Sequence, residues 1–316
     1  MSHISQQFGY LPEHCDITYG NITITTLYDL TQKIEGVESS ITTHRGWIYA
    51  PIVGTIDNPP IKSSRIFHLP KTHIITHHKA ISVHHLDFIL WIFGYLQGIR
   101  FTPEGHGYID ATPIKKHQIN DFIILRNSAR HSLAIADTFF KKQKNNNSSL
   151  FIASAIHCIM LSSIPNYLHF EKFNLMIQSI DACWKSIQEM NITQIKKTIP
   201  HAQRIRIMCE TLKIPTPEWA QCDKNGKTYI SSIRNSLIHE GLYFNKPLGY
   251  SNQNREAEYR NILFQLKNLI SRIILSLLVD DESINRYKLC RLLDRNMKGI
   301  KLSPSSPLKP PCPSST

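Results

Sequence analysis

The first 80 residues alternate apolar and polar side chains as half-buried β-strands do. The alternation is clearest over Asn21–Tyr28 and Ile61–Leu69, and a run rich in aromatic and β-branched residues lies between them in Ile41–Val53. The turn-forming sequence Asp57–Pro60 separates two of these segments. Period-two alternation bounded by turn residues indicates strands. We therefore predict a β-rich N-terminal domain over residues 1–85, built as a small sheet or sandwich.

From Leu86 onwards the apolar positions are continuous or follow helical spacing. Leu86–Ile99 is the most apolar segment, but it is shorter than the roughly 20 residues needed to span a bilayer, and Asp87 interrupts it. It predicts a buried helix and no membrane span. A second helix is predicted over residues 116–142, so that residues 86–146 form a helical connector packed on either domain.

The tract Lys141–Ser149 is polar throughout, and we interpret it as the loop that divides the two halves of the chain. The alternative is a helix–helix connection within one domain. The helical segments that follow are Leu150–Ser163, Phe170–Met190, Pro200–Leu212 and Ala257–Val279. They predict an all-α bundle over residues 147–300, and hence an α+β protein that is mostly α. Residues 301–316, rich in proline and serine, are predicted to be a disordered tail.

A short helix predicted within Ser231–Phe244 carries the candidate chemistry. Ile230, Ile233 and Leu237 follow the i, i+3, i+7 spacing of an apolar stripe that faces a core. Asn235 and His239 are four residues apart, so a regular helix places both on nearly the opposite face. Arg234 lies on the flank between the two faces. Gly241 follows His239 and is the residue type that most readily ends a helix.

The sequence Arg234-Asn235-Ser236-Leu237-Ile238-His239 resembles the Arg-x4–6-His signature of HEPN domains. Its continuation His239-Glu240-Gly241-Leu242-Tyr243-Phe244 is similar to the Apea-like branch of that superfamily, and the resemblance covers the C-terminal half only. It implies a small helical bundle that forms a homodimer and joins two motifs into a metal-independent ribonuclease site. It also implies catalytic roles for Arg234, Asn235 and His239, with no cofactor.

The bare Arg-x4-His spacing is not specific. With 16 His and 14 Arg in 316 residues, about 0.7 matches are expected by chance, and the chain contains a second one at Arg126–His131. A helical interpretation places Arg126 inside the apolar stripe formed by Ile119, Phe122, Leu133 and Phe140. That position favours a buried ion pair over an open site.

Charge favours a phosphate-bearing partner. The formal net charge is +12, and residues after Asn146 contain 22 Lys and Arg against 13 Asp and Glu. Because nucleic-acid affinity comes largely from Lys and Arg that neutralise phosphates, RNA is the predicted partner. The alternative is a basic protein without such a partner. Six basic residues would add a basic helix end useful for binding RNA, or simply a solvated face: Arg286, Lys288, Arg291, Arg295, Lys298 and Lys301.

The seven cysteines predict neither a disulfide framework nor a zinc knuckle, because their number is odd and no Cys-x-x-Cys occurs. Met1–Gly20 has no apolar core of a secretory signal. Both observations predict a cytoplasmic protein.

The segment Thr72–His85 contains five histidines: His73, His77, His78, His84 and His85. Imidazole is a good metal ligand, but the surrounding Ile, Thr and Val favour strands, in which adjacent histidines face opposite sides. No carboxylate or thiol in the segment completes a recognisable ligand set. We therefore predict no metal site there.

Four further polar residues extend the candidate site. His201 and Arg204 share a helix face, and these two residues and Glu240 could add contacts to RNA or its phosphates. An ordinary surface or capping role also fits His201 and Arg204. Asp181 could form a buried ion pair with Arg234. The predicted function is metal-independent RNA cleavage by the Arg234, Asn235 and His239 group, a toxin- or defence-like activity as the resemblance implies. The N-terminal domain would sense or recruit an unknown ligand. The competing prediction is a non-catalytic HEPN-like module that binds RNA, a nucleotide or a protein.

Overall fold

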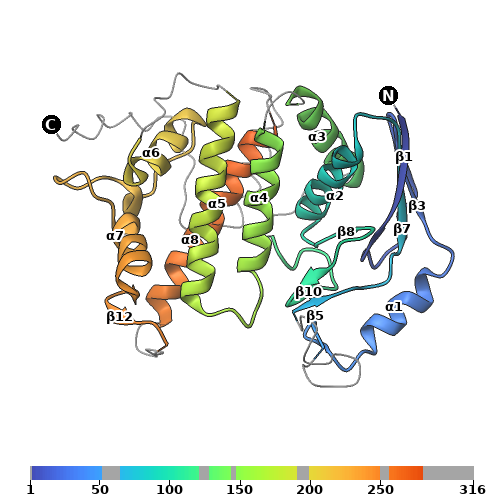
Figure 1. The fold of residues 1–316 in the computed structure, drawn as a ribbon, viewed down its shortest axis with the longest axis horizontal. Coiled ribbons are helices and arrows are strands. Elements are labelled where there is room, and N and C mark those ends of the chain that lie inside the picture. The colour runs from blue at the N-terminus through green and yellow to red at the C-terminus, as the bar shows by residue number, and fades with distance from the viewer. Residues whose placement is uncertain are drawn as a thin grey trace. The chain divides into compact units, whose positions relative to one another are not determined.

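The computed structural model divides the chain into two compact units, residues 1–144 and 145–316 (Figure 1). The structure describes residues 2–51, 65–120, 128–143, 147–190, 199–249 and 256–279. The predicted turn at Asp57–Pro60, the basic segment from Arg286 to Lys301 and the tail 301–316 lie outside the described residues.

The first unit is built on a five-stranded antiparallel sheet with the order β2-β3-β7-β1-β8. Its strands are β1 (Ser2–Gly9), β2 (Ile17–Tyr19), β3 (Ile22–Thr26), β7 (His73–Ala80) and β8 (Thr102–Pro103). In β7 the side chains of His73, Ile75 and His77 are buried, and His78 is exposed. The alternation predicted for this histidine-rich segment is therefore confirmed for β7, whereas His84 and His85 lie in a helix, α2 (Val83–Gln97), and the prediction of a strand there was wrong.

Two helices contact this sheet, α2 (Val83–Gln97) and α3 (Ser128–Lys142) (Figure 1). The buried helix predicted at Leu86–Ile99 is confirmed as α2, which ends at Gly98 in a left-handed conformation (φ +66°). Both helices belong to the first unit.

The helix predicted over residues 116–142 begins later than expected. The amide of His117 donates to the carbonyl of Gln97, and the amides of Gln118 and Ile119 donate to the carbonyl of Gly98. His117 also adopts a positive φ of +62°, which is not helical, and residues 116–120 form turns that complete the end of α2. This part of the prediction was wrong.

Smaller elements complete the first unit. A three-stranded antiparallel sheet has the order β10-β5-β4, and β6 pairs with β9. Their bounds are β4 (Thr43–His44), β5 (Trp47–Tyr49), β6 (Ile66–Phe67), β9 (Tyr108–Ile109) and β10 (Ala111–Pro113). Helix α1 (Leu30–Glu38) was not predicted. It buries Val37 in an apolar cluster with Ile48 and Tyr108.

The second unit is mainly helical, and the mixed α+β fold class is confirmed. Helices α4, α5 and α8 pack together (Figure 1). The described elements are α4 (Ser148–Ser162), α5 (His169–Glu189), α6 (His201–Thr211), η1 (Glu218–Ala220), α7 (Tyr229–Asn235), η2 (Ser236–Glu240), β11 (Leu242–Tyr243), β12 (Lys246–Pro247) and α8 (Glu256–Leu278). One segment of α8, Arg260–Leu278, is long and apolar enough to cross a membrane, but most of it is buried, as in the core helix of a soluble protein.

Candidate functional site

The motif helix α7 is short and is held at its start by reciprocal hydrogen bonds. The backbone amide of Ser231 donates to Oγ1 of Thr228 (3.1 Å), and the amide of Thr228 donates to Oγ of Ser231 (2.9 Å). This capping box satisfies amides that the first helical turn leaves free. Ile230 and Ile233 are buried, as the apolar stripe predicted. The stripe therefore fixes which side of α7 faces solvent.

The end of the motif helix is a π-turn, η2, rather than a regular α-helical turn. The amide of Gly241 donates to the carbonyl of Ser236, five residues earlier, and Gly241 adopts φ +66°. A regular helix turns about 100° per residue and would set Arg234 and His239 roughly 140° apart. The wider π-turn reduces that angle, so Arg234 and His239 come closer to one face than expected. A π-turn closed by a left-handed glycine is also an ordinary way for a helix to end, so the turn by itself does not mark a functional site.

Arg234 is half-buried and incompletely satisfied. Its Nη1 donates to Oδ1 of the adjacent Asn235 at 3.3 Å. Its Nε is buried and has no hydrogen-bond partner among the described residues. Asn235, His239 and Glu240 are exposed. The structure therefore exposes Asn235 and His239 at the end of the motif helix, whereas Nε of Arg234 is covered and unpaired among the described residues.

Asp181 on α5 does not pair with Arg234, contrary to the prediction. It accepts a hydrogen bond from Nη1 of Arg204 at 2.7 Å, and Nδ1 of His201 lies 3.2 Å from the same oxygen. The side chains predicted to contact phosphate, His201 and Arg204, thus both contact the carboxylate of Asp181 instead. The guanidinium of Arg204 also lies over the ring of Trp184, 5.9 Å from its centroid.

His201 links this ion-pair group to the motif. Burial lowers the pKa of His201. The nearby charges of Arg204 and Arg234 lower this pKa further, whereas the carboxylate of Asp181 raises it. The charge of Arg234 is thus close enough to disfavour protonation of His201.

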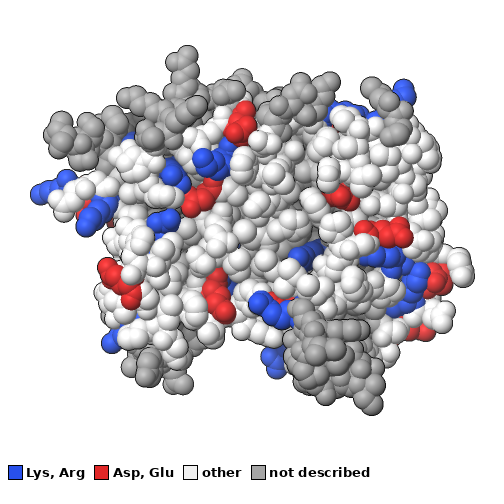
Figure 2. All heavy atoms as spheres, viewed as in Figure 1, with Lys and Arg blue, Asp and Glu red and all other residues white. Residues whose placement is uncertain are grey.

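The charged side chains of the described residues are not gathered into one basic surface on the face shown in Figure 2. Basic and acidic groups are interspersed there. Specific phosphate recognition by a few residues therefore agrees better with this face than a broad basic patch does.

The second motif copy is only partly described. Arg126 and Asn127 lie outside the described residues, and His131 is a half-buried residue of α3. The prediction that Arg126 forms a buried ion pair stays a prediction.

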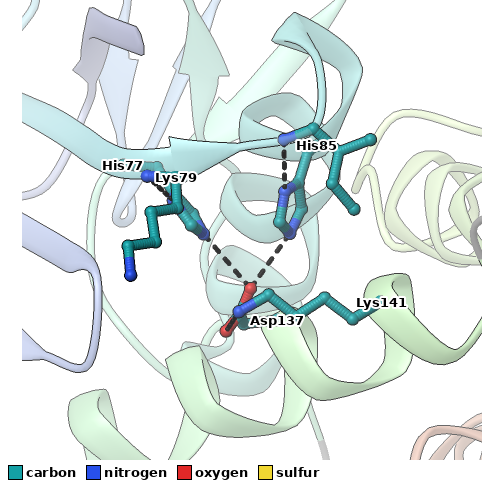
Figure 3. Close-up of polar contacts among 6 residues, drawn as sticks. His77, Lys79, His85, Asp137 and Lys141 are labelled. Atoms are coloured by element: carbon teal, nitrogen blue, oxygen red, sulfur yellow. Dashed lines mark hydrogen bonds and ion pairs between the residues drawn. The ribbon is translucent and has the colours of Figure 1, made fainter. Parts of the chain in front are cut away.

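A second polar cluster lies in the first unit and joins three elements (Figure 3). His77 comes from β7, His85 from the first turn of α2, and Asp137 from α3. Nε2 of His77 lies 3.2 Å and Nε2 of His85 lies 3.0 Å from the same carboxylate oxygen, Oδ1 of Asp137. Nζ of Lys141 lies 2.6 Å from the other oxygen, Oδ2. Both imidazoles are fully buried.

Backbone amides determine where the imidazole protons lie. The amide of Lys79 donates to Nδ1 of His77 (3.1 Å), and the amide of Ile81 donates to Nδ1 of His85 (3.4 Å). Each Nδ1 is therefore an acceptor, and in the neutral ring the proton sits on Nε2. Nε2 of His77 donates to Asp137, whereas the geometry at Nε2 of His85 is not that of a hydrogen bond.

Asp137 stays ionised in this cluster. Burial raises the pKa of its carboxyl, but the contacts from His77, His85 and Lys141 outweigh burial and leave the pKa well below its ordinary value. Asp137 was not predicted, because no carboxylate lies within the histidine-rich segment and Asp137 lies 60 residues beyond His77. Only the packing of α3 against β7 and α2 brings it there.

Comparison of the chain with protein-family models, with curated proteins and with solved structures gives no match. Function must therefore be inferred from the residues of this chain and from the motif resemblance. Two groups of residues carry that inference: the α7 motif, and the cluster of His77, His85 and Asp137.

Proposed function

We propose that the protein is a metal-independent endoribonuclease of the HEPN type, in which Arg234, Asn235 and His239 act on RNA. The observation that supports this most directly is the state of Arg234. Asn235 holds one edge of its guanidinium, while its buried Nε has no hydrogen-bond partner among the described residues. A buried donor left unsatisfied is destabilising by about 1–3 kcal/mol, so an acceptor that fills the place gains that energy. A phosphate oxygen would be such an acceptor once the atoms that cover Nε move aside.

The chemistry of RNA matches these residues. RNA carries its own nucleophile, the 2′-hydroxyl, so an enzyme has to move protons and stabilise the charge that develops on the phosphate. His239 would act as general base or acid, a role that contributes roughly 10²–10⁴-fold. Arg234 would bind the scissile phosphate with its planar fork, and Asn235 would orient it.

One such trio supplies a single imidazole, whereas cleavage requires a proton to be removed from the 2′-hydroxyl and another to be given to the leaving oxygen. A symmetric homodimer that brings two copies of the motif together would supply both. Exposed apolar side chains of the motif region agree with such contacts: Tyr229 and Ile238 are each 48% exposed.

The test is incubation of the purified protein with total RNA and with transfer RNA in EDTA, followed by analysis of the fragment ends. We expect fragments that end in 2′,3′-cyclic phosphate, and we expect His239→Ala to abolish them. His44→Ala is the matched control, because His44 is an exposed histidine of the first unit. RNA that is bound but left intact by a folded, dimeric wild-type protein would support the non-catalytic alternative instead.

A further inference from the structure

The cluster of His77, His85 and Asp137 has the composition of a metal site. Its three ligand atoms, two imidazole nitrogens and one carboxylate oxygen, all lie within 4.8 Å of one another. They come from β7, α2 and α3, so the fold itself brings them together. We propose that these three residues bind a divalent transition-metal ion, with Zn²⁺ as the ion that fits them best. This proposal concerns the first unit and does not rest on the ribonuclease proposal.

Two of the three ligand-atom spacings suit a small ion. Zn²⁺ bonds to imidazole nitrogen and carboxylate oxygen at about 2.0–2.2 Å, and tetrahedral geometry then sets neighbouring ligand atoms about 3.4 Å apart. The two nitrogen–oxygen distances are 3.2 Å for His77 and 3.0 Å for His85. Admission of the ion requires an outward movement of Asp137, together with movement of Lys141 and of the backbone amides of Lys79 and Ile81. Three protein ligands of this kind leave a further position open for water.

One atom of the cluster is held by an ion-pair contact without good hydrogen-bond geometry. Nε2 of His85 is buried and lies 3.0 Å from Oδ1 of Asp137, but the contact does not have the geometry of a hydrogen bond (Figure 3). Its ring stacks on Phe140, with centroids 4.4 Å apart and an interplanar angle of 11°. The orientation of the imidazole is therefore fixed by packing rather than by a hydrogen bond at Nε2. A metal ion between Nε2 and Oδ1 would replace this poorly aligned contact with two ligand bonds.

Access is from the side of α3. The imidazoles of His77 and His85 have no exposure, whereas the side chains of Asp137 and Lys141 are 13% and 41% exposed. Lys141 contacts Oδ2 and leaves Oδ1 directed at the two imidazoles. We therefore place entry of the ion and its water ligand beside Lys141, whose ammonium must move aside because of its like charge.

Binding also has a consequence for the backbone. Coordination through Nε2 requires the proton of each neutral ring to move to Nδ1, which now accepts from the amide of Lys79 or Ile81. In each histidine the new Nδ1–H group would then point at the N–H of the backbone amide, and the two donors would repel each other. The backbone between β7 and α2 must turn these amides away, so occupancy of the site should be visible as faster hydrogen exchange at Lys79 and Ile81.

The experiment uses the full chain, stripped with a chelator and dialysed, then titrated with Zn²⁺ while bound metal is counted by mass spectrometry. We expect each chain to bind one Zn²⁺ ion tightly, and Asp137→Asn should raise the dissociation constant of that ion at least tenfold. The double variant His77→Gln/His85→Gln should not bind the ion. The matched control is His78→Gln/His84→Gln, which removes two exposed neighbours and should retain the equivalent.

Substitution with Co²⁺ keeps the proposal testable if the variants fail to fold. The wild-type protein should give the visible absorption of a low-coordinate Co²⁺ site with nitrogen and oxygen ligands. Wild-type protein without a stoichiometric equivalent at micromolar Zn²⁺, or a folded Asp137→Asn variant with unchanged affinity, would overturn the proposal. If the His78→Gln/His84→Gln control no longer binds Zn²⁺, the ion is bound by surface histidines, and this result too would overturn the proposal.

Discussion

The guanidinium of Arg234 donates one hydrogen bond to Asn235, and its buried Nε has no partner among the described residues. A substitution can test whether its positive charge or its planar shape matters for function. Arg234→Lys keeps the charge but removes the planar fork. We expect RNA binding to weaken less than threefold, while the single-turnover cleavage rate falls by about 10²-fold, in the range seen when one donor to a developing negative charge is removed. Rapid-quench kinetics and equilibrium binding on the same RNA measure the two effects. Equal losses in binding and rate would contradict a transition-state role for Arg234.

His73 gives a prediction for the pH dependence of stability. Burial lowers the pKa of this imidazole from 6.5 to about 4. The unfolded chain therefore binds a proton before the folded chain does, so the contribution to stability is complete above pH 6.5 and is lost as the pH falls from 6.5 to 4. The loss is at most about 3 kcal/mol for this shift.

The check on His73 is urea unfolding of the wild type and of His73→Gln at pH 7.5 and pH 4.5, followed by amide exchange in β1 and β7. We expect the difference in unfolding free energy between the two pH values to be smaller in the variant. An unchanged difference would mean that another group, such as Asp137, dominates the acid sensitivity of the first unit.

At the residue scale, the sequence predicted local placement better than long-range pairing. Helical spacing opposite the apolar stripe of Ile230 and Ile233 correctly predicted that Asn235 and His239 are exposed. The partner of Asp181 was predicted wrongly, because Arg204 and Arg234 lie on different helices and no periodicity says which of them reaches α5. Asp137 was missed for the same reason, since its contact with His77 depends on tertiary packing.

At the scale of the element, the π-turn that ends α7 should matter for function as well as for stability. Gly241 adopts φ +66°, where an added Cβ is strained, so Gly241→Ala should lower stability by about 1 kcal/mol. We also expect slower RNA cleavage, because relief of the strain alters the turn that presents His239.

Gly226 provides the matched control for this element. It has φ +71° and, like Gly241, no atom within 4 Å of an added Cβ. Gly226→Ala should therefore lower the melting temperature by a similar amount and leave the cleavage rate unchanged. If both variants slow cleavage equally, the effect is one of general stability and the π-turn has no special role.

Helical periodicity predicted α4, α5, α6 and α8 because each buries a continuous apolar stripe in the second unit. It missed α1, whose nine residues lie between strands and bury only Leu30 and Val37. It extended α3 too far towards the N-terminus, because residues 116–120 are used to complete the end of α2 and no local pattern reveals that use.

At the scale of the whole molecule, the mixed α+β organisation followed from a change in hydrophobic period along the chain. The excess of basic residues in the second half predicts that RNA binding depends on salt. For two to three phosphate contacts on single-stranded RNA, raising salt from 50 to 200 mM should weaken binding by about tenfold. Fluorescence anisotropy with a labelled RNA measures this slope, and affinity that does not change with salt would contradict phosphate recognition.

The measurement that tests the central claim most directly compares two RNA substrates that differ in one atom. The first contains the cleavage position mapped on natural RNA, and the second carries a single 2′-deoxynucleotide on the 5′ side of that bond. We predict that the wild-type protein in EDTA cuts the first substrate there and leaves the second intact at that position, because the 2′-hydroxyl is the nucleophile. Cleavage of both substrates at the same bond would contradict the proposed chemistry, and binding of both without cleavage would contradict catalysis.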